Sequence, residues 1–415
     1  MAVIKPFKAL RPTQNLAHLV ASVPYDVLNT EEARGFIENN EYSLLRVTRS
    51  EAEFPDKTNP YSDEIYARAA ENLSKLVNNG SLIQDTEERF YLYKLEMNGR
   101  AQTGIAATFS VDDYDNDIIM KHEKTRKEKE DDRTKHIVTT GAQTGPVFLT
   151  YKGSAGVDAV VAEVCGNTKP LYMFTAPDGI KHTVWTVPAD KNAEIIKGIK
   201  NCDKLYIADG HHRAASASRA RTAKREANPS HNGTEEYNYF IAVLFPASQL
   251  AIMPYNRVVA DLNGKTKEDF LAEVKEKFMV EEVSQKEPHE LRTFSMYLDG
   301  RWYVLKARDS ILASLSLSKS VGEHLDVSIL QSFLLNPILG IDDPRTNKRI
   351  DFVGGIRGTG ELEKLVDSKK FAVAFSMYPL TVDDLMNISD AGEIMPPKST
   401  WFEPKLRDGL LVHLI

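Results

Sequence analysis

Three short turns constrain the fold of this chain more than any other feature of its sequence. Each is an Asn-Gly or Asp-Gly pair between two apolar stretches: Asn98-Gly99, Asp178-Gly179 and Asp299-Gly300. Such pairs favour the positive φ angles of the two-residue turn whose twist matches that of paired strands. We therefore predict three antiparallel hairpins, over residues 89–111, 171–187 and 293–306.

Helical patterns are mingled with these hairpins. Residues 62–79 carry apolar side chains at helical spacing and stop at Gly80. Further helices are expected over residues 190–200, 266–278 and 327–335, and Thr381–Asp384 resembles a capping box. Because strands and helices are mixed and the hairpins imply antiparallel pairing, the predicted fold class is α+β, or mixed α/β, rather than a doubly wound sheet.

A chain of 415 residues is long enough for two domains. The hydrophilic stretch Asn263–Lys267 follows a strand that ends near Val259. We expect the domain boundary there, which gives an N-terminal region of residues 1–262 and a C-terminal α+β region of residues 263–415. Segments of the second region are expected to complete a site built on the first.

The overall charge argues against two kinds of partner. With 52 basic and 59 acidic residues the chain carries a net charge of −7, which disfavours broad attraction to nucleic acid or to an anionic membrane. No apolar stretch reaches the ~20 residues of a membrane helix, and the N-terminus does not resemble a signal peptide.

Cys165 and Cys202 form no disulfide or zinc pattern. We therefore expect a soluble, cytoplasmic protein with no nucleic-acid or membrane partner.

The segment of residues 205–215 carries the densest chemistry in the sequence. An apolar strand ends at Asp209 and Gly210, and an alanine-rich helix then begins with three basic residues, His211, His212 and Arg213. At a helix N-terminus, free backbone N–H groups and the macrodipole favour anions, and a guanidinium can fork onto a phosphate or carboxylate. Asp209 can cap the helix, bind a cation or accept a proton. We interpret the segment as an anion site for phosphate. The alternative is an aspartate N-cap with two surface histidines.

Two other acidic positions are candidates for the same chemistry. Glu123 precedes a charged run and can be a general base or a metal ligand, with His122, Thr125 and Arg133 as neighbours. The alternative is a solvated helix start, since charge runs usually face water. Asp26 follows Pro-Tyr and can either cap a turn or hold a cation or a substrate amine.

The C-terminal part of the chain holds two more candidate segments. The loop of residues 395–402 is stiffened by two prolines and presents Lys398, Ser399 and Thr400, which suit phosphate oxygens. Alternatively, this loop is a rigid connection that its aromatic residues anchor to the core. Arg257, at the end of a Pro-Tyr-Asn-Arg run, is expected to leave a strand with its side chain exposed.

Five motifs occur in an order that resembles one known family. They are Pro24–Val27, His122–Thr125, Ala208–Arg213, Pro254–Arg257 and Met395–Thr400. So arranged, they look like the bacterial and archaeal family catalogued as domain of unknown function 1015. The resemblance covers nearly the whole chain.

The Asp-Gly-His-His-Arg run within the third motif is similar to the phosphate-binding segment of the ParB/sulfiredoxin superfamily. Free-serine kinases of that superfamily carry the same five residues, sulfiredoxins place related residues near ATP, and ParB proteins bind CTP with a cognate element. The resemblance implies a ParB/sulfiredoxin-like nucleotide-binding core within residues 1–262, elaborated by the hairpins. It also implies a Mg²⁺-dependent phosphotransferase that uses ATP or ADP and acts on a small hydroxyl metabolite, with free L-serine as the first candidate.

Under this interpretation the candidate residues take three roles. The predicted catalytic residues are Asp209, Glu123 and His211, and Asp209 is also the predicted Mg²⁺ ligand. The predicted nucleotide-binding residues are Gly210, His212, Arg213, Lys398, Ser399 and Thr400. The predicted substrate-binding residues are Asp26, His122, Thr125 and Arg257. Two alternatives stay open: a hydrolase in which the two adjacent histidines and an acid bind a metal, and a non-catalytic nucleotide-binding module. Assembly into a homo-oligomer also stays open.

Overall fold

The computed structural model describes residues 1–415 and contains all three predicted hairpins. Their strands are β4 (Tyr91–Met97) with β5 (Arg100–Ser110), β9 (Tyr172–Thr175) with β10 (Lys181–Thr186), and β16 (Thr293–Leu298) with β17 (Arg301–Ala307). Asn98 and Asp299 have φ angles of 51° and 50°. These two turns therefore have the positive-φ geometry that an Asx-Gly pair predicts.

The predicted helices are also present, with small shifts at their ends. They are α4 (Asp63–Asn78), α8 (Asn192–Lys200), α10 (Lys267–Lys277) and α14 (Val382–Asp390). Before α14, Thr381 and Asp384 form the expected reciprocal capping box. The helix expected over residues 327–335 is α12 (Asp326–Leu330), which continues over Gln331–Leu335 as a π-helical turn.

The chain divides into two units at positions that differ from the predicted boundary. Unit 1 consists of Met1–Leu250 and Pro404–Ile415, and unit 2 consists of Ala251–Glu403. The hydrophilic stretch at residues 263–267 is not a linker, because it connects β14 (Tyr255–Val259) to α10 inside unit 2. A polar turn and a polar linker have the same composition, so the sequence alone did not distinguish them.

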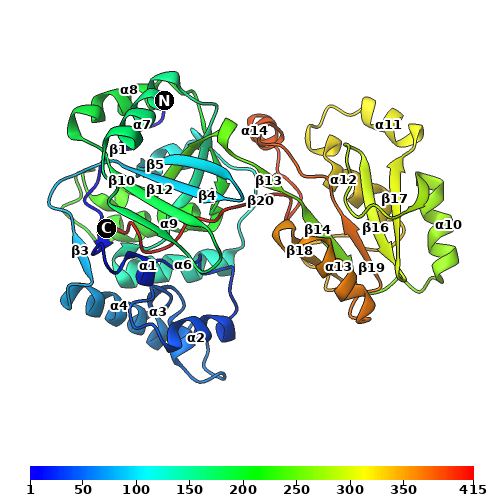
Figure 1. The fold of residues 1–415 in the computed structure, drawn as a ribbon, viewed down its shortest axis with the longest axis horizontal. Coiled ribbons are helices and arrows are strands. Elements are labelled where there is room, and N and C mark those ends of the chain that lie inside the picture. The colour runs from blue at the N-terminus through cyan, green and yellow to red at the C-terminus, as the bar shows by residue number, and fades with distance from the viewer. The chain divides into compact units, whose positions relative to one another are not determined.

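Unit 1 is built on a nine-stranded mixed sheet (Figure 1). Its other strands are β1 (Ile4–Lys5), β6 (Ile119–Met120), β8 (Val147–Tyr151), β11 (Leu205–Asp209) and β12 (Tyr239–Pro246). The order is β6-β11-β8-β12-β5-β4-β10-β9, with β1 against β5. β11 runs parallel to the edge strand β6, and β12 runs parallel to β8. The apolar strand β11 is buried as far as Ala208 and reaches solvent only at Asp209.

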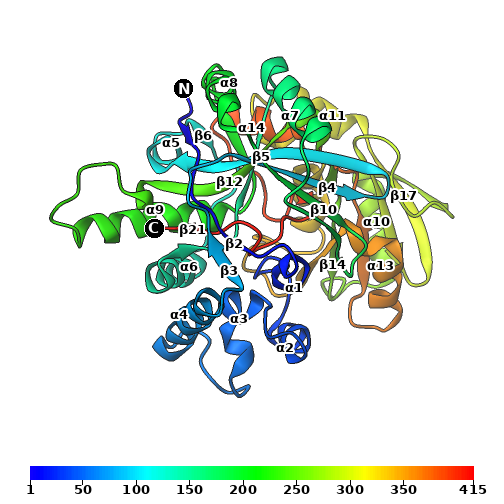
Figure 2. The ribbon, with the colours of Figure 1, turned by 60° about the vertical axis from the view of Figure 1, so that its left-hand side comes forward.

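Helices of unit 1 pack on this sheet. α7 (Ala155–Asn167) and α8 contribute valine and isoleucine side chains to a large core cluster of unit 1. α6 (Lys127–Thr140) and α9 (His211–Glu226) run side by side, and α4 packs against α6 (Figure 2). The shorter helices are α1 (Ala17–Val20), α2 (Thr30–Glu38), α3 (Leu45–Thr48) and α5 (Val111–Asp115), and β2 (Leu10–Pro12) pairs with β3 (Leu82–Gln84).

The last residues of the chain belong to unit 1. β21 (His413–Leu414) pairs with β7 (Ala142–Gln143), and the backbones of Val412 and Leu10 exchange two hydrogen bonds of 2.9 Å. Leu411 and Val412 are buried, and Val412 packs in a core cluster with residues from α3 and α4. The C-terminal segment is therefore an integral part of unit 1.

Unit 2 is built on a six-stranded antiparallel sheet. The order is β15 (Phe278–Val283), β17, β16, β19 (Val373–Ser376), β14 and β18 (Ile350–Gly354). α13 (Gly358–Asp367) packs Leu362 and Val366 against Val258 of β14. The other elements are α11 (Asp309–Ser316) and the short pair β13 (Ile252–Met253) with β20 (Trp401–Phe402).

Each unit combines helices with a sheet that is largely or wholly antiparallel, so the fold class is mixed α/β, as predicted. No helix in the protein has both the length and the apolar character needed to cross a bilayer.

Leu411→Ala tests the role of the C-terminal segment. Leu411 is 1% exposed, so its truncation should leave a cavity and lower the free energy of unfolding by about 2–5 kcal/mol. Urea unfolding followed by circular dichroism measures this change. The control is Leu317→Ala, because Leu317 is 85% exposed and its loss should change stability by less than about 0.5 kcal/mol. Equal stability of the two variants would contradict the assignment of this segment to the core.

Candidate functional site

The turn between β11 and α9 needs glycine at position 210. Gly210 has a φ angle of 94°, and a Cβ there would lie 2.8 Å from Nε of Arg213. α9 therefore starts at His211 with no side chain capping its first backbone N–H groups. The alternative of an aspartate N-cap with two surface histidines is wrong, since Asp209 ends the strand and His211 is 5% exposed.

Asp209 is held between two cations. One carboxylate oxygen accepts a hydrogen bond from Nη2 of Arg213 at 2.6 Å, and the other accepts one from Nζ of Lys405 at 3.1 Å. Burial favours the neutral acid, but Lys405 and Arg213 outweigh it and hold the pKa of Asp209 well below its ordinary value. Asp209 is therefore ionised throughout the physiological range.

Arg213 is fixed on its other side as well. Its Nη1 donates to the backbone carbonyl of Pro146, just before β8, and only 11% of the side chain is exposed. Burial opposes its charge, but the carboxylates of Asp209, Asp408 and Asp26 together raise its pKa above the ordinary value. The guanidinium is thus a permanent positive charge beside the uncapped start of α9.

Two histidines pack behind this turn. The rings of His122 and His211 lie 4.4 Å apart in an edge-to-face arrangement at 88°. Burial lowers the pKa of His211 to about 3, although Asp209 acts in the opposite direction. Burial also holds the pKa of His122 well below its ordinary value. Neither ring nitrogen of His122 makes a hydrogen bond, and Nε2 of His211 makes none either. Both rings are therefore neutral, and His122 is buried at 2% exposed, so its predicted contact with a substrate stays a prediction.

His212 joins the starts of two helices. Its Nε2 accepts a hydrogen bond of 3.1 Å from the backbone N–H of Arg126, the residue that precedes α6. Burial lowers the pKa of His212, while the carboxylates of Glu123 and Asp26 act in the opposite direction. Because α6 also lacks a side-chain cap, two helix N-termini with free N–H groups lie close together.

The remaining candidates of unit 1 lie around this pair of helix starts. Glu123 is 38% exposed, and its Oε2 is 3.8 Å from Nδ1 of His211. The hydroxyl of Thr125 donates to Glu130 one turn into α6, so it is already used within the chain. Asp26 is exposed on the loop before α2.

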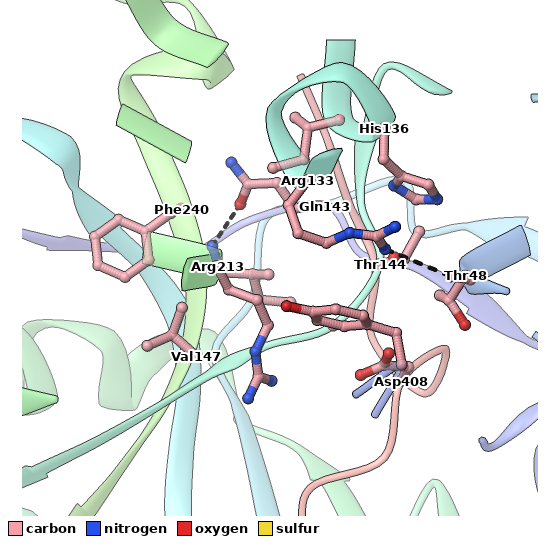
Figure 3. Close-up of a pocket in the computed structure, with 13 residues that line it drawn as sticks. Thr48, Arg133, His136, Gln143, Thr144, Val147, Arg213, Phe240 and Asp408 are labelled. Atoms are coloured by element: carbon pink, nitrogen blue, oxygen red, sulfur yellow. Dashed lines mark hydrogen bonds between the residues drawn. The ribbon is translucent and has the colours of Figure 1, made fainter. Parts of the chain in front are cut away.

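A small cavity adjoins Arg213 (Figure 3). It measures about 30 Å³, enough for a water molecule, and Arg133, Arg213, Tyr25 and Asp408 are among the residues that line it. Asp408 is 2% exposed, and its Oδ1 has no hydrogen-bond partner. Arg133 is paired with its neighbour Asp132 at 3.0 Å rather than with Glu123.

Sequence reasoning missed Lys405 and Asp408. Both lie in the short C-terminal segment that returns to unit 1. A lysine and an aspartate near a chain end carry no local pattern that separates them from ordinary surface charges. Only the strand pairing of the chain end, which brings residues far apart in sequence together, reveals their positions.

Four predicted site residues lie in unit 2: Arg257, Lys398, Ser399 and Thr400. Arg257 is 3% exposed, so the expectation that it is exposed is wrong; it is on β14, a strand inside the sheet. The hydroxyl of Ser399 donates to the carbonyl of Pro396 at 2.6 Å and is used within its own loop. Nζ of Lys398 lies 5.5 Å from the ring centre of Tyr255.

The geometry does not favour a metal site on the predicted ligands. Both oxygens of Asp209 already accept hydrogen bonds from cationic side chains, those of Arg213 and Lys405. These two positive charges would repel Mg²⁺, so the Asp209 side chain does not fit the role of a metal ligand. Nε2 of His212 is used by Arg126, and no group of three or more metal-binding side chains is present. The hydrolase alternative therefore lacks a preformed set of ligands.

Asp408→Asn should change stability in a pH-dependent way. Burial raises the pKa of Asp408 to about 7, while Arg213 acts in the opposite direction. The unfolded group titrates near pH 4, so the folded protein binds the extra proton between about pH 4 and 7 and loses stability as pH rises through that window. Removing the charge should therefore raise Tm at pH 8 and change it little at pH 5.

Thermal unfolding at the two pH values measures the effect, and Asp190→Asn at an exposed position is the control. An equal change in Tm at pH 5 and pH 8 would contradict the assigned protonation of Asp408.

Comparisons with known proteins relate about three quarters of the chain to other sequences and structures. Similar solved structures include free serine kinase in complex with AMP, with a TM-score of 0.34 and 13% identity over 75% of this chain and 92% of that chain. SbnI with C-terminal truncation from Staphylococcus aureus has a TM-score of 0.38 and 12% identity over 74% and 87% of the two chains. A conserved hypothetical protein from Pyrococcus furiosus has a TM-score of 0.33 and 14% identity over 75% and 95%. TM-scores this low do not establish a shared fold, and the ParB/sulfiredoxin-like core stays a prediction.

The sequence comparisons are more specific. No curated protein matches this chain. The family model described as protein of unknown function (DUF1015) matches residues 4–328, which is most of the chain and includes four of the five ordered motifs. The chain therefore belongs to the DUF1015 family.

Proposed function

We propose that the protein is a nucleotide-dependent phosphotransferase that moves a phosphoryl group from ATP or ADP to a small hydroxyl metabolite. Free L-serine is the first acceptor to test. The observation that carries this proposal is the fixed arrangement of Arg213 and Lys405 about Asp209, directly beside the uncapped start of α9.

The site supplies positive potential in the form that phosphate oxygens need. Arg213 keeps N–H donors beyond the two that Asp209 and Pro146 accept, and the first turns of α9 and α6 offer backbone N–H groups. Phosphoryl transfer depends mainly on positioning and on stabilising charge that spreads over the transferred group. Donors held by buried ion pairs supply this with little reorganisation.

Asp209 acts as a positioning group for the two cations in this proposal. Its side chain is 31% exposed, so one edge faces solvent although both oxygens are engaged. A carboxylate oxygen has a second lone pair, so Asp209 can also orient an acceptor hydroxyl. Mg²⁺ would arrive on the nucleotide phosphates and neutralise part of their charge, since Asp209 does not fit as its ligand.

Glu123 is the proposed general base. Its carboxylate lies next to His211 and is partly exposed. A general base needs such exposure, because it must contact the hydroxyl proton of a substrate that enters from solvent. The neutral His211 ring shields one side of this carboxylate from water without competing for a proton. The buried His122 has a supporting role, because it packs against His211 rather than facing the open side of the turn.

Arg213→Met tests the nucleotide site by binding alone. Loss of a charge-assisted hydrogen bond costs about 1.5–3 kcal/mol, so the Kd for MgATP or MgADP should rise about 10- to 100-fold. Titration calorimetry well below Tm measures this Kd. Arg225→Met is the matched control, because Arg225 is exposed near the other end of the same helix. Equal affinity of both variants would place the nucleotide elsewhere.

Asp209→Asn tests catalysis. Without its charge the two cations lose their common anchor, and the rate of phosphoryl transfer to L-serine or another acceptor hydroxyl should fall about 10²-fold. The measurement is formation of AMP or ADP with each donor over a panel of hydroxyl metabolites, and Asp203→Asn at an exposed position is the control. A wild-type rate in Asp209→Asn would contradict the proposed role. Tight nucleotide binding with no turnover of any acceptor would instead support the non-catalytic module.

A further inference from the structure

Unit 2 contains a buried arginine that has no acidic partner. Arg257 is 3% exposed on β14, between β18 and β19. Its one hydrogen bond runs from Nη1 to the backbone carbonyl of Tyr255, and its guanidinium lies 5.5 Å from the ring centre of Phe352. No carboxylate forms an ion pair with it.

This arrangement is unfavourable for a purely structural side chain. A buried charge is costly unless a counter-charge pairs with it. The other arginine buried to this degree, Arg407 at 4% exposed, pairs with Asp178. A carbonyl and an aromatic ring do not neutralise Arg257, and burial lowers its pKa to about 10, which still leaves it charged near neutral pH.

The surroundings of Arg257 bring two distant motifs together. Side chains two residues apart on a strand share a face, so Tyr255 and Arg257 lie on the face of the sheet opposite to Val258 and α13. The ring of Trp401 lies 5.1 Å from that of Tyr255, and Nζ of Lys398 lies 5.5 Å from the same ring. Pairing of β13 with β20 fixes this contact between the segment at residues 253–257 and the loop at residues 395–402.

The guanidinium also has donors to spare. Nε and Nη2 of Arg257 make no hydrogen bond, and neither is among the fully enclosed polar atoms without a partner. Both nitrogens are therefore not fully enclosed, and each has an N–H group left for an acceptor. The carboxylate of Glu403 in the same loop accepts a hydrogen bond from Nε1 of Trp401 at 3.1 Å.

We propose that Arg257 anchors an anion site within unit 2, which binds a small molecule through a carboxylate or phosphate group. The ligand supplies the missing counter-charge through a forked pair of hydrogen bonds to the guanidinium. Tyr255 and Phe352 form the aromatic border of the site, with ring centres 6.0 Å apart. Lys398 adds positive potential on the side of Tyr255. This site does not depend on the phosphotransferase activity proposed for unit 1.

The experiment compares Arg257→Met with Arg301→Met in the full-length chain. Arg301 is an exposed arginine of the same unit that pairs with Glu282 at 3.0 Å, so it controls for the loss of a charge. Thermal unfolding is measured without ligand and with inorganic phosphate or succinate at constant ionic strength. Without ligand, Arg257→Met should have a Tm equal to or above that of the wild type, because an unpaired buried charge is removed.

The anion dependence decides the proposal and its ligand class. Phosphate, succinate or both should raise the Tm of the wild type and of Arg301→Met by a few degrees, and Arg257→Met should lose that rise for the same anion. Because phosphate can also bind in unit 1, the test is repeated in an Arg213→Met background, where the effect of Arg257 should persist. A lower Tm for ligand-free Arg257→Met together with an unchanged anion effect would show that Arg257 is structural. An absence of any anion effect that depends on Arg257 would equally overturn the proposal.

Discussion

The ion pairs of Asp209 are the interaction on which the candidate site depends. This carboxylate fixes Arg213, in the first turn of α9, and Lys405, from the C-terminal segment, at the same point. The strand, the helix and the chain end of unit 1 are thereby connected through one partly buried carboxylate. Ion pairs of this kind contribute little net stability, since desolvation offsets most of their attraction. Their consequence is geometric: the positive charges keep one position while the backbone N–H groups of α9 stay unoccupied.

The neutral histidines extend the same principle. A protonated ring at position 211 would add a charge that burial disfavours, and its low pKa keeps that charge absent near neutral pH. The positive potential of the site therefore comes from Arg213, Lys405 and the helix N-termini, and not from a histidine whose charge changes with pH. By contrast, Asp408, behind Arg213, titrates close to pH 7 and gives the buried side of the site its own pH dependence.

Much of the fold could be predicted from local sequence. The turns at Asn98 and Asp299 and the capping box at Thr381 each have a local physical cause, so the elements beside them were found. The turn at Gly210 also has a local cause, so the central motif of the candidate site, Asp209–Arg213, could be predicted from the sequence. The unit boundary and the burial of Arg257 were not found, because both follow from which strands pair across long separations. For the same reason the ion pair of Lys405 with the carboxylate of Asp209 could not be predicted from the sequence.

The most direct measurement of the central claim is nuclear magnetic resonance of protein labelled with [¹⁵N]histidine. The chain has 10 histidines, and two of them, His211 and His212, provide the first backbone amides of α9. If the uncapped start of α9 binds nucleotide phosphates, titration with MgADP should shift these two amide signals, while that of His289 in unit 2 stays unchanged. Saturable binding of MgADP that leaves both signals unmoved would contradict the account.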